Sequence, residues 1–118
     1  MKTLVIGASE NPERYSNMCI RRLKQHGHEV NALGLREGEV NGVKIEKARI
    51  AFKDIDTVTL YLNPSRQKEL YDYILSLHPR RIIFNPGTEN PELEEKAEAK
   101  GIETIEACTL VMLSIGNF

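Results

Sequence analysis

The sequence has little of what marks membrane proteins or disulfide-stabilised secreted proteins. It contains no tryptophan, only two cysteines (Cys19 and Cys108) and no long apolar run, whereas a membrane-spanning helix needs ~20 consecutive apolar residues. Two distant cysteines form neither a disulfide framework nor a zinc site, so we expect two reduced thiols. The N-terminus enters a strand pattern without a signal peptide. We therefore expect a cytoplasmic protein that does not bind membranes.

An excess of one charge is also missing. The 118 residues carry 16 Lys and Arg against 17 Asp and Glu, a net charge of −1. Because nucleic acids are bound by strongly basic domains, they are not expected partners. The length and the 41% hydrophobic content fit one domain over residues 1–118, with no room for a second catalytic domain. A small-molecule ligand is the expected partner, and a protein partner or a homodimer stays open.

The stretch 2–16, KTLVIGASENPERYS, has the pattern of a nucleotide site. Leu4 to Ile6 form an unbroken apolar run, which is typical of a parallel strand covered on both faces. Gly7, Ala8 and Ser9 then allow the backbone to approach a ligand closely. The helix pattern of residues 14–26 follows, and its free N–H groups favour a phosphate.

Strand and helix patterns alternate along the rest of the chain. We expect strands at 29–35, 43–45, 57–62, 81–84 and 102–106, and further helices at 64–78 and 91–100. Residues 48–55 suggest one helical turn, and 108–113 either a short helix or an edge strand. The alternation predicts an α/β fold, a three-layer, doubly wound, Rossmann-like parallel sheet of about five to six strands in the order 3-2-1-4-5(-6).

Two features predict where a ligand binds. The strand order places the switch point between the strands ending at Ile6 and Leu62. The dipeptide Asn-Pro follows predicted strands at 11–12, 63–64, 85–86 and 90–91. These dipeptides either belong to a ligand-binding edge or are there only because Asn and Pro favour turns and helix starts.

The glycine loop argues against NAD. Ser9 and Pro12 stand where the second and third glycines of G-x-G-x-x-G would be. After the second strand, Gly34-Leu35-Arg36 replaces the acid that would hold an NAD ribose. Arg36 suits the 2′-phosphate of NADP or the 3′-phosphate of coenzyme A, unless it is only a solvated surface residue. Arg14 is placed to hold a pyrophosphate, with the same alternative.

Four segments resemble a known family: VIGASENPERYS, TLYLNP, FNPGTENPE and EACTLVML. They look like the stand-alone CoA-binding domain family, which is related to the N-terminal domain of the succinyl-CoA synthetase α subunit. The family pattern G-[AL]-S-x-[ND]-P-x-R is matched by Gly7, Ala8, Ser9, Asn11, Pro12 and Arg14.

The resemblance implies a Rossmann-type domain and a set of ligand contacts. Gly7, Ser9, Arg14, Tyr15 and Ser16 would surround the pyrophosphate and the adenosine. The resemblance also implies that the ligand pocket is walled by Asn63 and Pro64, and that the pantetheine exit is lined by Pro86 and Gly87. The turn of residues 84–87 departs from the frequent family versions.

Catalytic groups are not evident. We interpret His26, His28 and His78 as capping or surface residues, and no catalytic triad or carboxylate pair can be assembled. Cys108 is either a small buried apolar residue or a thiol that forms a mixed disulfide with CoA.

The sequence therefore predicts non-catalytic binding of CoA or acyl-CoA, with a regulatory role as one option. The alternatives are an NADP-linked reductase, with Tyr61 or Tyr15 as proton donor, and a nucleotide-dependent interaction protein.

Overall fold

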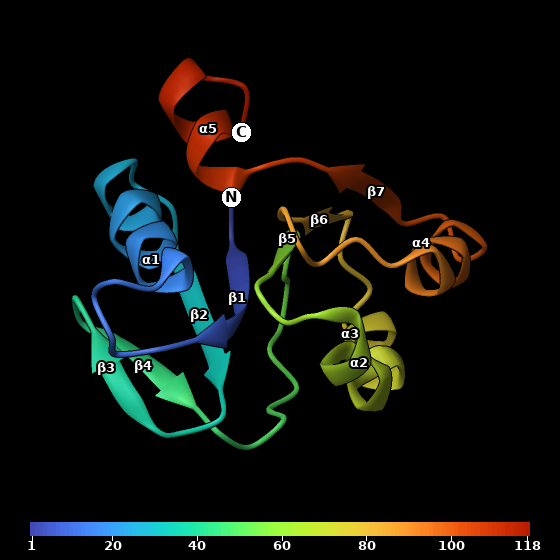
Figure 1. The fold of residues 1–118 in the computed structure, drawn as a ribbon, viewed down its shortest axis with the longest axis horizontal. Coiled ribbons are helices and arrows are strands. Elements are labelled where there is room, and N and C mark those ends of the chain that lie inside the picture. The colour runs from blue at the N-terminus through green and yellow to red at the C-terminus, as the bar shows by residue number, and fades with distance from the viewer.

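Seven strands form one sheet through the middle of the molecule (Figure 1), in a computed structural model that describes residues 1–118. The spatial order is β3-β4-β2-β1-β5-β6-β7, and every pair is parallel except β3 with β4. The strands are β1 (Thr3–Ala8), β2 (Val30–Gly34), β3 (Gly38–Val40), β4 (Val43–Glu46), β5 (Thr57–Leu60), β6 (Arg81–Phe84) and β7 (Glu103–Glu106).

Helices cover both faces of the sheet. They are α1 (Tyr15–Gln25), α2 (Pro64–Gln67), the 3₁₀ helix η1 (Lys68–Leu70), α3 (Tyr71–Ser76), α4 (Pro91–Glu98) and α5 (Thr109–Ile115). In Figure 1, α1 and α5 lie on one side of the sheet, while α2, α3 and α4 lie on the other. None of these helices is long and apolar enough to cross a membrane.

The central strand β1 explains the two-sided core. Leu4, Val5 and Ile6 are all fully buried, because side chains of a strand alternate between the two faces of a sheet. Leu4 and Ile6 pack in the larger core, under α3 and α4, whereas Val5 packs in the core under α1. The unbroken apolar run is therefore a correct signal of a buried parallel strand.

The predicted α/β class and strand order are confirmed when β4 is counted as the third strand. The predicted count of about five to six strands is wrong, because β3 adds an antiparallel edge. Asn41 and Gly42, both with positive φ (49° and 81°), form the turn that joins β3 to β4. Asn-Gly is a recognisable turn signal, but the three residues of β3 are too short to suggest a strand from sequence.

Three other expectations change at element boundaries. Residues 48–55 contain no helix, and the expected helix at 64–78 is divided into α2, η1 and α3. Residues 109–115 form α5, which settles the open choice between helix and edge strand. The predicted starts of α2 and α4 are correct, because Asn63 and Asn90 cap them and a proline opens each first turn.

Candidate functional site

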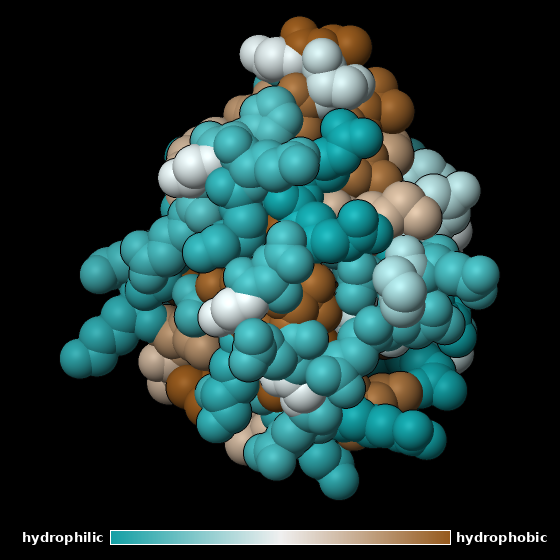
Figure 2. Space-filling view, turned by 90° about the vertical axis from the view of Figure 1, so that its left-hand side faces the viewer, coloured by the Kyte–Doolittle hydropathy of each residue, from teal (hydrophilic) through white to brown (hydrophobic).

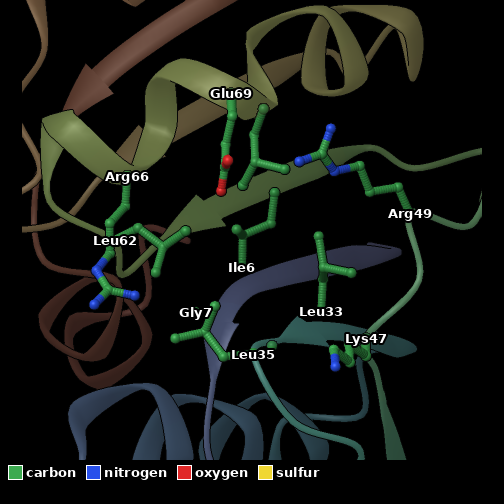
Figure 3. A pocket seen from close by; sticks show the side chains of 11 residues that line it. Ile6, Gly7, Leu33, Leu35, Lys47, Arg49, Leu62, Arg66 and Glu69 are labelled. Atoms are coloured by element: carbon green, nitrogen blue, oxygen red, sulfur yellow. The ribbon is translucent and has the colours of Figure 1, made fainter.

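A cavity of about 190 Å³ opens at the carboxyl ends of β1 and β2 (Figure 3). This is the crevice where open α/β sheets bind ligands, because the chain crosses over in opposite directions from neighbouring strands. Its floor is apolar and includes Ile6, Leu33 and Leu62. The cavity is lined by Ile6, Gly7, Leu33, Gly34, Leu35, Lys47, Arg49, Leu62, Arg66, Glu69 and Leu70.

Charged side chains stand around this apolar floor. Lys47 and Arg49 come from the loop after β4, Arg66 from α2 and Glu69 from η1. None of the four takes part in an ion pair, and the pairs in the molecule are Lys2–Glu29, Lys44–Glu46, Arg80–Asp56 and Arg80–Glu103. The cavity therefore presents three cations and one carboxylate that are free to meet a ligand.

Two glycines form backbone walls of the cavity. A Cβ on Gly7, whose φ is +94°, would lie 3.0 Å from the carbonyl carbon and oxygen of Tyr61. A Cβ on Gly34 would lie 2.5 Å from the carbonyl oxygen of Ala8. Since real Cβ atoms do not approach backbone so closely, any larger residue would push β1 away from its neighbours. Glycine is thus favoured at position 7 by packing and by its positive φ, and at position 34 by packing alone.

A buried glutamine fixes the wall formed by α2 and η1. Gln67 is fully buried, and its Nε2 donates to the carbonyls of Leu62 and Thr88, both at 2.8 Å. Its Oε1 accepts from Asn90, which also donates to the Tyr71 hydroxyl. All these buried polar groups are paired, so the segment that carries Arg66 and Glu69 is held firmly to the turn after β6.

A second buried network ties the start of α5 to the same edge of the sheet. Asn85 donates to Thr59 Oγ1 at 2.7 Å and to the carbonyl of Leu60 at 2.8 Å. Its Oδ1 accepts from the backbone N–H of Thr109 at 2.8 Å. Cys108, the residue before α5, is thereby brought to the carboxyl edge of β5 and β6.

The loop expected to hold phosphate has an ordered hydrogen-bond pattern outside the cavity. Ser9 Oγ accepts from the N–H of Asn11 at 3.1 Å, and Asn11 Oδ1 accepts from the N–H of Glu13 at 3.0 Å. Arg14 and Tyr15 are exposed at the start of α1, with no acidic residue in its first turn. Ser16, in contrast, is buried.

Only two of the fifteen residues predicted from sequence line the cavity, namely Gly7 and Gly34. Several others lie beside lining residues: Arg36 follows Leu35, and Asn63 with Pro64 separates Leu62 from Arg66. Of the remaining predicted residues, Ala8 ends β1, and the others lie in neighbouring loops or at helix starts: Ser9, Asn11, Pro12, Arg14, Tyr15, Ser16, Pro86, Gly87 and Cys108.

Sequence reasoning missed Lys47, Arg49, Arg66 and Glu69. The first two follow β4, and the others follow β5, so each comes soon after the carboxyl end of a strand. A search for charged residues within about six positions of each strand end would have found Lys47, Arg49 and Arg66, because these ends share one edge of a parallel sheet, but it would have missed Glu69, which lies further along after β5.

The phenol of Tyr61 lies near the thiols of Cys19 and Cys108, on the face of the sheet that α1 covers. Its hydroxyl is buried and makes no hydrogen bond. Burial, with the nearby Cys19, raises the pKa of Tyr61 well above its ordinary range. Burial likewise raises the pKa of the Cys19 thiol to about 12. No group of three or more His, Cys, Asp or Glu side chains is arranged to hold a metal ion.

Comparison with known proteins identifies the family. The model of the CoA binding domain matches residues 1–114, so the chain belongs to the CoA binding domain family. A search among curated proteins gives no match.

Solved structures agree on the fold. An uncharacterized protein is 53% identical with a TM-score of 0.97, over 99% of this chain and 97% of that one. Cell-free ID.343 from Thermus thermophilus is 21% identical with a TM-score of 0.86, over 99% and 90%. The dinucleotide forming acetyl-coenzyme A synthetase 1 of Ca. Korarchaeum cryptofilum is 19% identical with a TM-score of 0.72. That match covers 90% of this chain but 25% of the synthetase.

Proposed function

We propose that this chain binds coenzyme A or an acyl-CoA at the carboxyl edge of its sheet and performs no chemistry on it. The observation that carries the proposal is the cavity with an apolar floor and three unpaired cations, in a member of the CoA binding domain family. The floor suits the flat adenine base, and the cations suit the three phosphates that accompany it. Residues 1–118 would then form one cytoplasmic CoA-binding domain with a regulatory role.

The cations lie in two groups, which suggests an orientation for the ligand. In Figure 3, Arg66 stands on the side of Gly7, whereas Lys47 and Arg49 stand on the side of Leu33. We assign the pyrophosphate to the side of Gly7, where Arg66 and the start of α1 offer positive charge. The 3′-phosphate is assigned to Lys47 and Arg49. Pantetheine would then leave across the loop edge toward Pro86, Gly87 and Cys108.

An NADP-linked reductase is the alternative that the same cavity allows. It would place the 2′-phosphate on Arg36 and use Tyr61 or Tyr15 as a proton donor. The Tyr61 hydroxyl is buried, and Tyr15 is 69% exposed. Neither tyrosine lines the cavity, so the structure favours binding over reduction.

Isothermal titration of the purified chain with CoA, acetyl-CoA and NADP⁺ tests this proposal. We expect CoA to bind at micromolar concentration and NADP⁺ to bind much more weakly. The double variant Lys47→Ala, Arg49→Ala should weaken CoA binding about tenfold or more, because each charged hydrogen bond contributes ~1.5–3 kcal/mol.

Lys44→Ala is the matched control. Lys44 lies in β4, close to Lys47 in the chain, but it pairs with Glu46 and does not line the cavity. It removes one positive charge, where the double variant removes two, and should leave CoA affinity within about twofold, since this cation lies outside the cavity and is screened by solvent. Tighter binding of NADP⁺ than of CoA, or equal effects of the two sets of variants, would contradict the proposal.

A further inference from the structure

Glu69 is the one acidic residue among those that line the cavity. Figure 3 shows its carboxylate directed into the cavity between Arg66 and Arg49. It nevertheless forms no ion pair with either arginine. A carboxylate left unpaired between two cations has its acceptor lone pairs available to a ligand.

The backbone holds Glu69 in this position. It lies in η1 between two buried residues, Gln67 and Leu70, which are 0% and 7% exposed. The side-chain amide of Gln67 is hydrogen-bonded to Leu62 and Thr88 on either side. These contacts fix the η1 backbone at the cavity wall, and the exposed side chain of Glu69 extends from it into the cavity.

The chemistry of a carboxylate limits what it can meet. An ionised carboxylate only accepts hydrogen bonds, and it repels phosphate. The ligand group next to Glu69 must therefore be a hydrogen-bond donor. The floor below it is formed by apolar side chains, including Ile6 and Leu62, and this surface suits the face of a purine better than a ribose.

We propose that Glu69 accepts a hydrogen bond from the 6-amino group of the adenine base and so determines the base specificity of the site. This inference rests on the proposed binding of CoA and names the group that distinguishes adenine from other bases. The phosphates are thereby directed to the two cationic sides of the cavity, away from the carboxylate. Glu69 thus sets the orientation of the ligand as well as its identity.

Two matched CoA fragments test the assignment. Adenosine 3′,5′-bisphosphate carries the 6-amino group, and the purine-riboside bisphosphate has hydrogen in its place. Competition against CoA gives the affinity of each. The wild-type chain should prefer the adenosine compound by about tenfold or more, as expected for a hydrogen bond to a charged group. Glu69→Gln, which keeps an uncharged acceptor, should reduce the preference to about threefold, and Glu69→Ala should abolish it.

Asp72→Asn is the control variant. Asp72 is exposed on the next turn, does not line the cavity and carries the same charge, so its removal should leave the preference at the wild-type ratio. If Glu69 only repels anionic ligands, Glu69→Ala would raise the affinity of both fragments equally and leave their ratio unchanged. That result would overturn the assignment, as would a wild-type ratio near one.

The 2′-deoxy form of adenosine 3′,5′-bisphosphate separates the base from the sugar. If Glu69→Ala removes a preference for the ribose 2′-hydroxyl instead of the amino group, the base assignment is wrong. If CoA binds to the wild-type chain and neither fragment competes, the base is not in this cavity, and only the Glu69 inference fails. If CoA itself does not bind, the proposed function fails and the inference falls with it.

Discussion

Cys19 and Cys108 differ in their surroundings although both lie near Tyr61. Cys19 lies on the buried face of α1, and its pKa of about 12 leaves almost no thiolate at neutral pH. Cys108 is half-buried and directly precedes α5. Because the thiolate is the reactive form, the two cysteines should react very differently with disulfides.

We predict that CoA disulfide modifies Cys108 and not Cys19. The Cys108 thiolate would attack one sulfur of CoA disulfide, forming a protein–CoA mixed disulfide and releasing one CoA thiolate. Intact mass measurement and peptide mapping should find one CoA adduct per chain, on the peptide with Cys108. Cys108→Ser should remove it. An unmodified Cys108 in a chain that binds CoA would refute this prediction, and so would an adduct on Cys19.

Between elements, buried polar side chains replace apolar packing at the carboxyl edge of β5 and β6. Asn85 is 2% exposed and joins Thr59, Leu60 and Thr109. Removing it leaves the Leu60 carbonyl and the Thr109 N–H without this partner, and each such group costs ~1–3 kcal/mol, whereas the Thr59 hydroxyl keeps its bond to the Thr109 hydroxyl. The network thus links the stability of the sheet edge to the position of α5.

Asn85→Ala should lower the free energy of unfolding by about 3 kcal/mol. Urea unfolding followed by circular dichroism measures this change. Asn63→Ala serves as the comparison, because Asn63 is exposed and its side chain caps α2. Loss of such a cap costs about 1 kcal/mol. Equal destabilisation by both variants would show that the buried network contributes no more than a helix cap.

The sequence predicted most elements because their signals are local. The apolar run of β1 and the Asn-Pro starts of α2 and α4 are each contained in a few adjacent residues. Its failures have physical causes. β3 is a three-residue edge strand that depends on pairing with β4, and η1 interrupts a helix pattern where Gln67 is drawn into the core.

The cavity was harder to predict, because its wall is assembled from separate segments. Gly7 was recognisable as a residue that allows close approach, and Gly34 as a residue at the end of the second strand. Lys47, Arg49, Arg66 and Glu69 meet only after the loop of residues 47–56 and the α2–η1 segment have folded over the sheet edge. The sequence places most of these residues after strand ends but does not show that they converge on one cavity, and the resemblance to the family directed attention to the first loop instead.

Across the whole molecule, charge is distributed unevenly between the two edges of the sheet. At the amino edge Arg80 pairs with Asp56 and Glu103, and the Arg80 guanidinium holds the pKa of Asp56 below its ordinary value. At the carboxyl edge Lys47, Arg49 and Arg66 are unpaired. A net charge of −1 therefore conceals a local cationic site for an anionic ligand.

Apolar surface is concentrated elsewhere. The face shown in Figure 2 is mostly hydrophilic, with apolar atoms at its top, at the height of α5 in Figure 1, and in smaller patches at its centre and lower left. Val111 and Ile115 of α5 are 53% and 66% exposed. The cavity and this apolar surface lie over different elements, so a ligand in the cavity leaves α5 uncovered.

The most direct test of the central claim is an amide chemical-shift map recorded while the ¹⁵N-labelled chain is titrated with CoA. We predict saturable shifts that are largest at Gly7, Gly34 and Lys47, which border the cavity on three segments. Amides at the amino edge, such as those of Asp56 and Arg80, should stay nearly unchanged. The absence of shifts, or shifts confined to the amino edge, would contradict the binding of CoA in this cavity.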